Sequence, residues 1–136
     1  MINETATPDT TTRSRAAGWR FFTAAAVLAS AVLHVYLYTE WAKNLTPLGQ
    51  AFLAQAAVGV VLAVLVLTWR SPLPLVGALL YGLGSIGAFS LSAATGFLGV
   101  TAQLVGWEEY ATKVVELLAV VGAVVALLVE RKRSPR

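Results

Sequence analysis

Five side chains that could do chemistry lie within apolar runs of the sequence: His34, Tyr38, Gln55, Ser92 and Glu116. A charged carboxylate left unpaired in hydrocarbon is costly, so Glu116 is expected to face protein partners or water. Beside a histidine, which titrates near neutrality, this carboxyl group could exchange a proton with the outer face of a membrane. A quinone or a lipid headgroup could instead be bound by His34, Tyr38 and Gln55. These five residues therefore form the candidate ligand-binding site, with Tyr38 at its mouth.

The residue types disfavour several other chemistries. His34 is the only histidine and the only methionine is the first residue, so one chain cannot supply two histidine or methionine ligands to a haem. A haem with His34 as its single axial ligand, or held between the His34 residues of a dimer, is still possible. His34 and Glu116 would need further ligands to hold a transition metal. Ser92 with His34 and Glu116 has the residue types of a hydrolytic triad, but no nucleophile elbow or oxyanion sequence accompanies it. The absence of cysteine excludes thiol catalysis and disulfides. We therefore assign no metal, no cofactor and no catalytic residue, and favour a non-enzymatic protein without excluding an enzyme.

The candidate site residues are expected at one depth in the membrane. Counting about 1.5 Å per residue from the outer end of each run puts His34, Gln55, Ser92 and Glu116 on the order of 6 to 12 Å below the outer surface. Helical spacing gives each of three runs a stripe of small or polar residues, and such stripes normally pack against other helices. The stripes are Thr23, Ser30, His34 and Tyr38; Ala51, Gln55, Gly59 and Ala63; and Glu116, Ala119, Ala123 and Ala126. The site is thus predicted to face inward and to open to the outside.

A purely structural role would explain the same residues. Glu116 could pair with Lys113 one turn away, and His34 could hydrogen-bond to a neighbouring serine or carbonyl group. The polar groups would then only specify how the helices pack. We favour a functional site, because ionisable residues inside a membrane are costly and tend to mark function.

Composition and apolar runs predict the fold class. Of the 136 residues, 57% are hydrophobic and only 12% are charged, whereas a soluble domain would carry about 25% charged residues. The runs are long enough to cross a bilayer four times, at about residues 20–40, 47–69, 74–96 and 109–130. We therefore predict an all-α, integral membrane four-helix bundle over residues 18–131. The Thr-rich segment 1–17 is predicted to be a disordered tail, and residues 132–136 a basic tail.

Local signals predict the ends of these helices. Thr46 and Pro47 have the residue types of an N-cap and a first helical residue. The segment 70–74 contains two prolines and predicts a tight turn that stops one helix and starts the next. The segment 97–107 is too apolar for a free loop and too short to span, so it is predicted to lie at the membrane interface.

Two spacings predict contacts of the third and fourth helices. Gly84, Ala88, Ser92 and Gly96 recur every four residues and predict a stripe against which another helix packs closely. Glu109 and Lys113 stand at the favourable i, i+4 spacing for an ion pair.

The basic residues predict the orientation of the chain. All of them except Lys43 and Lys113 fall on the face that carries both termini or the turn at 70–74. The positive-inside rule therefore predicts a cytoplasmic N-terminus and a cytoplasmic C-terminus. Because these residues lie in the tails and one turn and form no folded basic face, we expect no nucleic-acid partner.

Three segments carry a resemblance to a known group of proteins: LHVYLY (33–38), PLGQAFLAQ (47–55) and LSAATGFLG (91–99). They resemble a group of small uncharacterised four-span membrane proteins of actinobacteria, over about residues 25–125. The resemblance implies a four-helix protein of the inner membrane. It brings no established activity or catalytic residue with it.

Together these features predict a multi-pass protein of a bacterial plasma membrane that acts as an accessory or ligand-binding component. Besides the lipid bilayer, its small-residue stripes would accommodate a membrane-protein partner or a homo-oligomer. The alternative is a small transporter or proton-coupled carrier that uses Glu116 and His34. Small multidrug-resistance transporters carry an essential glutamate in the first span, whereas this chain has His34 there and its acidic residue in the fourth.

Overall fold

The described residues form four long α-helices and one short 3-10 helix. The computed structural model describes residues 7–96 and 106–133, with side chains placed for 14–96 and 106–132. The elements are α1 (Thr7–Glu40), the 3-10 helix η2 (Ala42–Asn44), α2 (Leu48–Thr68), α3 (Leu73–Thr95) and α4 (Trp107–Arg133). The described part of the chain contains no strand.

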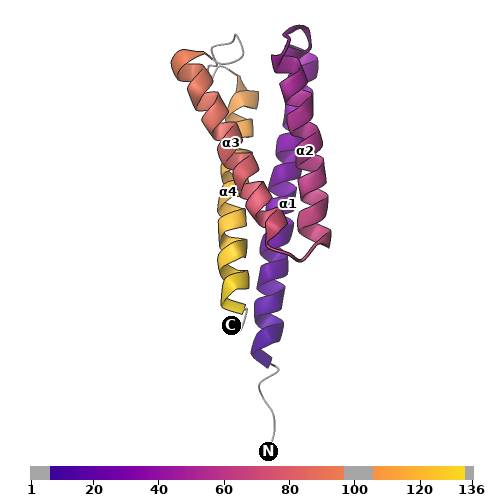
Figure 1. The fold of residues 1–136 in the computed structure, drawn as a ribbon, viewed down its shortest axis with the longest axis vertical. Coiled ribbons are helices and arrows are strands. Elements are labelled where there is room, and N and C mark those ends of the chain that lie inside the picture. Colours follow the sequence, from indigo (N-terminus) through magenta and orange to yellow (C-terminus); the bar gives the residue numbers. More distant parts are fainter. Residues whose placement is uncertain (1–6, 97–105, 134–136) are drawn as a thin grey trace, which may run out of the picture.

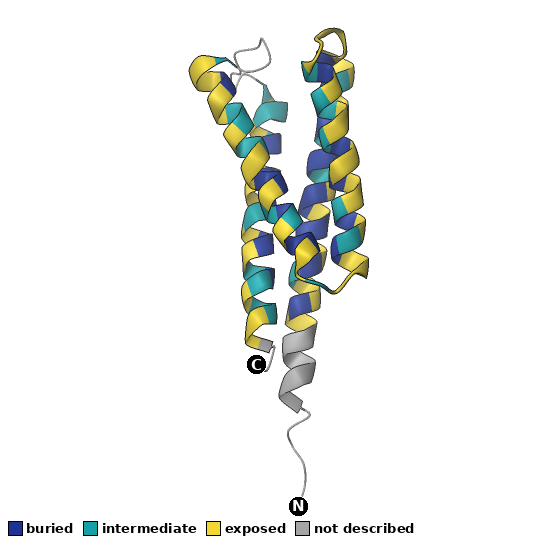
Figure 2. Cartoon of the chain, in the orientation of Figure 1, coloured by how far each residue is buried: buried dark blue, intermediate teal, exposed yellow. Residues whose placement is uncertain are grey.

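Each of the four α-helices is long and apolar enough to cross a membrane. The qualifying stretches are Ser14–Glu40, Leu48–Thr68, Leu73–Thr95 and Trp107–Lys132. Exposed positions cover the outside of the bundle (Figure 2). Many of them carry large apolar side chains, such as Val61, Leu80 and Leu117, which are 56%, 62% and 55% exposed. Such a continuous apolar surface suits lipid as the solvent and would be an aggregation liability in water. The predicted all-α membrane bundle is confirmed.

The helices are arranged around α1, as Figure 1 shows. Helix α1 packs along both α4 and α2, whereas α3 packs mainly on α4 and touches α2 and α1 less. We call the end of the bundle where α1 stops and α2 begins the Trp41 end, and the opposite end, with the α2–α3 turn, the Arg20 end. The start of α1 and the end of α4 both lie toward the Arg20 end.

Small residues let the helices approach closely. A Cβ atom on Gly122 of α4 would lie 2.7 Å from Oγ1 of Thr23 in α1. A Cβ atom on Gly59 of α2 would lie 2.6 Å from the hydroxyl oxygen of Tyr81 in α3. The predicted inward faces of α2 and α4 are confirmed, since Gly59 and Ala63 are buried and Ala119, Ala123 and Ala126 are wholly buried.

The predicted packing stripe on α3 is wrong in part. Gly84 is exposed, and nothing would lie within 4 Å of a Cβ atom built on it. The buried residues of α3 lie mainly on another face, which carries Pro74, Leu75, Ala78, Tyr81 and Gly82. Small residues permit a close approach but do not require one, whereas a buried tyrosine must find a partner for its hydroxyl group.

The helix ends differ from the predictions at two places. Helix α1 already begins at Thr7, so the tail predicted over residues 1–17 is helical from there on. Pro8 falls in its first turn, where a missing N–H group is tolerated, and extending an existing helix costs little. Leu48, and not Pro47, is the first residue of α2; Pro47 occupies the N-cap position without a side-chain capping bond, after a cis Thr46–Pro47 peptide bond.

The third helix has the predicted boundaries to within a residue. Its start at Leu73 follows the turn predicted over 70–74, and the side-chain oxygen of Ser71 accepts a hydrogen bond from the Leu73 N–H group at 3.1 Å. It ends before Gly96, whose φ of 85° favours glycine and whose N–H group donates to the Ser92 carbonyl oxygen at 2.9 Å. Most of the segment predicted to lie at the interface, residues 97–105, is outside the described residues.

Candidate functional site

Glu116 of α4 is the centre of the candidate site and is wholly buried. One carboxylate oxygen, Oε1, accepts a hydrogen bond from Nζ of Lys113 at 2.6 Å. The other, Oε2, lies 3.7 Å from Nε2 of His34 and has no hydrogen-bond partner among the described residues. A buried carboxylate oxygen without a partner is costly, so this atom is poised to accept a hydrogen bond.

His34 of α1 is held by its own helix. Its Nδ1 atom lies 2.8 Å from the carbonyl oxygen of Ser30, a contact that assigns the ring proton to Nδ1. The neutral ring then presents Nε2, as an acceptor, to Oε2 of Glu116. Two acceptors that face each other need one proton, or one donor group of a ligand, between them.

Helices α2 and α3 contribute a second set of polar side chains. Nε2 of Gln55 donates a hydrogen bond to Oγ of Ser85. The Tyr81 hydroxyl group donates to Oγ of Ser30 at 3.4 Å, in the space that Gly59 leaves open. Ser85 also lies beside the Glu116 carboxyl group. All four helices thus meet in one polar cluster, consisting of Ser30, His34, Gln55, Tyr81, Ser85, Lys113 and Glu116.

Aromatic rings border the polar cluster toward the Trp41 end. The Phe52 ring of α2 packs edge-on against His34, with centroids 5.4 Å apart, and Trp41 packs against Phe52 at 5.8 Å. Between α3 and α4, Nζ of Lys113 lies 4.7 Å from the centroid of the Phe89 ring. The ionisable groups are therefore shielded by aromatic side chains.

Three of the five predicted site residues meet in the polar cluster: His34, Gln55 and Glu116. Tyr38 is half-buried and packs near Gly49 of α2, about one turn beyond His34 toward the Trp41 end. Ser92 is buried in the last turn of α3, about two turns from Ser85. Gln55 contacts Ser85 of α3, and Figure 1 shows that α3 is tilted against its neighbours.

Tyr81 and Ser85 also belong to the polar cluster, although they were not among the predicted site residues. A signal for both exists in the sequence, because Tyr81 is a tyrosine deep within an apolar run and Ser85 follows it at the i+4 position on the same face. The predicted Glu109–Lys113 pair is wrong. Oε1 of Glu109 accepts the N–H group of Gly106 at 2.7 Å, while Lys113 pairs with the more deeply buried Glu116, where the low dielectric strengthens the attraction.

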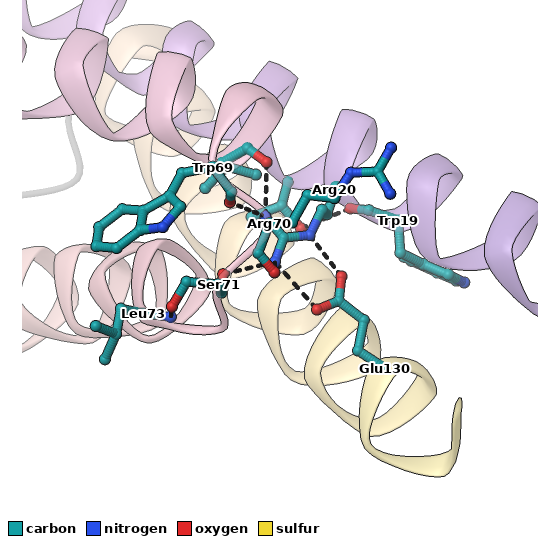
Figure 3. A network of polar contacts seen from close by, with 9 residues as sticks. Trp19, Arg20, Trp69, Arg70, Ser71, Leu73 and Glu130 are labelled. Carbon is teal, nitrogen blue, oxygen red and sulfur yellow. Dashed lines mark hydrogen bonds and ion pairs between the residues drawn. The ribbon is translucent and has the colours of Figure 1, made fainter. Parts of the chain in front are cut away.

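A second polar network lies at the Arg20 end (Figure 3). Arg20 is 8% exposed and donates to both carboxylate oxygens of Glu130, from Nε at 2.5 Å and from a terminal nitrogen at 3.0 Å. Its terminal nitrogens also donate to the carbonyl oxygens of Val66, Trp69, Arg70 and Ser71, at 2.8, 2.9, 3.1 and 2.7 Å. These carbonyls include the last ones of α2, which lack partners within the helix. We call this network the Arg20 clasp; it joins α1, α4 and the α2–α3 turn.

The region between the polar cluster and the Arg20 clasp is apolar. Its buried side chains are chiefly Val27, Leu75, Ala78, Ala123 and Ala126, and Thr23 donates its hydroxyl group to its own helix, to the Trp19 carbonyl oxygen at 2.8 Å. Within the described residues, no group of three or more His, Cys, Asp or Glu side chains is placed to hold a metal ion. Apolar packing therefore separates the polar cluster from the Arg20 clasp.

The fold and the polar cluster define a small four-span membrane protein with an ionisable site buried between its helices. Comparison of the chain with protein-family models, with curated proteins and with solved structures gave no match.

Proposed function

We propose that this protein is an accessory, ligand-binding component of a bacterial plasma membrane, and that the polar cluster is its binding site. The observation that carries the proposal is Oε2 of Glu116, which is wholly buried and has no hydrogen-bond partner among the described residues. The Lys113 contact satisfies Oε1, whereas Oε2 faces His34 at 3.7 Å, with Ser85 beside the carboxyl group, and can still accept a hydrogen bond from a ligand.

The chemistry of the site selects the kind of ligand. Oε2 of Glu116 accepts hydrogen bonds, and so does Nε2 of a neutral His34. The ligand group must therefore be a donor, such as a hydroxyl group of a quinol or of a lipid headgroup, or an ammonium group. An oxidised quinone offers only acceptors and would need a protonated Glu116 or His34.

The distribution of charge supports an outward-facing site. Arg70 lies in the α2–α3 turn and Arg131 and Lys132 in the last turn of α4, all toward the Arg20 end, whereas Lys43 lies at the Trp41 end. The positive-inside rule then directs the Arg20 end to the cytoplasm and the Trp41 end, with the polar cluster, to the outside.

Native mass spectrometry of the protein purified in mild detergent tests the proposal. We expect a bound small molecule or subunit with the wild type and its loss in Glu116→Gln, which keeps the shape of the side chain. Glu40→Gln is the matched control, because Glu40 is an exposed carboxylate at the end of α1. The same bound species in the wild type and in Glu116→Gln would overturn the proposal.

A proton-coupled carrier is the second candidate, and the 3.7 Å approach of His34 to Glu116 favours it, because the pair can hold one exchangeable proton. The apolar region below the cluster opposes it, since a carrier must also open to the cytoplasm. Protein reconstituted in liposomes separates the two. A carrier would dissipate an imposed proton gradient when ligand is added and would lose this activity in Glu116→Gln, whereas a binding component leaves the gradient intact.

A further inference from the structure

The ammonium group of Lys113 lies between a carboxylate and an aromatic ring. Its Nζ atom donates to Oε1 of Glu116 at 2.6 Å and lies 4.7 Å from the centroid of the Phe89 ring. A carboxylate on one side and an aromatic ring on the other are the groups that recognise organic ammonium ions in proteins. The site is built from α3 and α4.

Lys113 can leave this site, but Glu116 cannot. The Lys113 side chain is 23% exposed, whereas that of Glu116 is 0% exposed. A lysine near the end of a membrane helix can extend its ammonium group to the headgroup region. Its departure would leave a buried carboxylate without a cation, which is strongly unfavourable, so another cation must take its place.

The unpartnered Oε2 atom of Glu116 indicates that a free cation would be bound more completely than Lys113. Lys113 is three residues from Glu116 on the same helix and reaches only Oε1. An untethered ammonium group has three N–H donors and is free to approach both carboxylate oxygens.

We propose that Glu116 and Phe89 bind the alkylammonium group of an external ligand, and that Lys113 is a tethered competitor that fills the site when the ligand is absent. The ammonium group belongs to a free amine or to the ethanolamine headgroup of a lipid. This inference rests on the proposed function, because it names the ligand class of the polar cluster.

Chemical rescue of Lys113→Ala tests the inference directly. The substitution removes a propylammonium-sized group, so propylammonium should raise the melting temperature of the detergent-solubilised variant in a saturable way. Propanol, which lacks the charge, should not. Lys43→Ala, which removes an exposed lysine at the same end of the bundle, should respond as the wild type does. No saturable shift in Lys113→Ala overturns the inference.

The wild type provides a second test, which applies if Lys113→Ala does not fold. Propylammonium should also stabilise the wild type, but with a half-saturating concentration roughly tenfold or more above that of Lys113→Ala, because a tethered group competes at a high effective concentration. Phe89→Leu keeps an apolar side chain and should weaken the wild-type response several-fold, since the cation–π contact is lost. A wild type without a saturable response, or one that Phe89→Leu leaves unchanged, contradicts the inference.

Nanodiscs with and without phosphatidylethanolamine separate the two sources of the ammonium group. Stabilisation by this lipid that is lost in Glu116→Gln identifies the headgroup, and stabilisation by the soluble amine alone identifies a free amine; both support the ammonium site. Glu116-dependent binding of a quinol without any response to amines would overturn this inference and leave the proposed function standing.

Discussion

Nε2 of His34 in α1 and Oε2 of Glu116 in α4 lie 3.7 Å apart, with side chains that are 9% and 0% exposed. The imidazole ring is held by the Ser30 carbonyl group and the carboxylate by Lys113. Neither group can turn away from the other without breaking one of these bonds. The two side chains are therefore held facing each other between the first and the last span.

The Lys113–Glu116 pair should respond unequally to the loss of either partner. We expect Lys113→Met to lower the free energy of unfolding by about 3 kcal/mol, because it leaves a wholly buried carboxylate without its cation. Glu116→Gln should cost only about 1 kcal/mol, since Lys113 can extend toward the headgroups. Unfolding curves in detergent measure both values, and the double variant should be more stable than Lys113→Met alone. Equal losses in the two single variants would refute this asymmetry.

Gly59 should not tolerate a methyl group. A Cβ atom there would lie 2.6 Å from the Tyr81 hydroxyl oxygen and 3.1 Å from Cβ of Ala31, so Gly59→Ala should destabilise the bundle by about 1 to 3 kcal/mol. Tyr81→Phe removes the hydroxyl group and should recover part of this loss in the double variant. Gly84→Ala is the control, because open space surrounds that position, and it should be neutral or slightly stabilising. A similar loss from Gly59→Ala and Gly84→Ala in thermal unfolding would contradict the close α2–α3 contact.

The Arg20 clasp should require a guanidinium group. A lysine keeps the charge but has three donors in place of five, so Arg20→Lys should lose about 2 to 4 kcal/mol of stability by leaving carbonyl oxygens of the α2–α3 turn unsatisfied. Arg15→Lys changes an exposed arginine of α1 and should leave the melting temperature unchanged. An Arg20→Lys variant with the same melting temperature as the wild type would contradict the stabilising role of the Arg20 clasp.

The orientation can be tested by labelling, because the sequence contains no cysteine. A membrane-impermeant maleimide should label Lys43→Cys in intact cells and Arg131→Cys only after permeabilisation, since Lys43 lies at the Trp41 end and Arg131 at the Arg20 end. Both positions are exposed, so access to the reagent depends on the side of the membrane alone. The reverse pattern would place the polar cluster on the cytoplasmic side.

The spans and the inward faces of three helices could be predicted because their signals are strong. Length and hydropathy locate a span, and Ala119, Ala123 and Ala126 around Glu116 repeat at helical spacing. Helix α3 gave a weaker signal, since glycine, alanine and serine occur on more than one of its faces. Its rotation is decided by the single large polar side chain, Tyr81, and its tilt brings Ser85, and not Ser92, to Gln55.

Contacts between distant residues could not be predicted from the sequence. In the sequence, Arg20 resembles any basic residue at the end of a membrane span. Its partners include backbone carbonyl groups some fifty residues away, and no side chain in the sequence marks those carbonyls. Lys113 had two acidic residues within reach of its side chain. Burial decides between them, and burial follows from the packed bundle, not from spacing.

The Arg20 clasp also sets an order for assembly. Its two charged members come from the first and the last span, so the guanidinium group has no counter-charge until Glu130 has been synthesised and inserted. The bonds from Arg20 to the α2–α3 turn need only the first three spans, whereas neutralisation of the guanidinium charge needs the fourth.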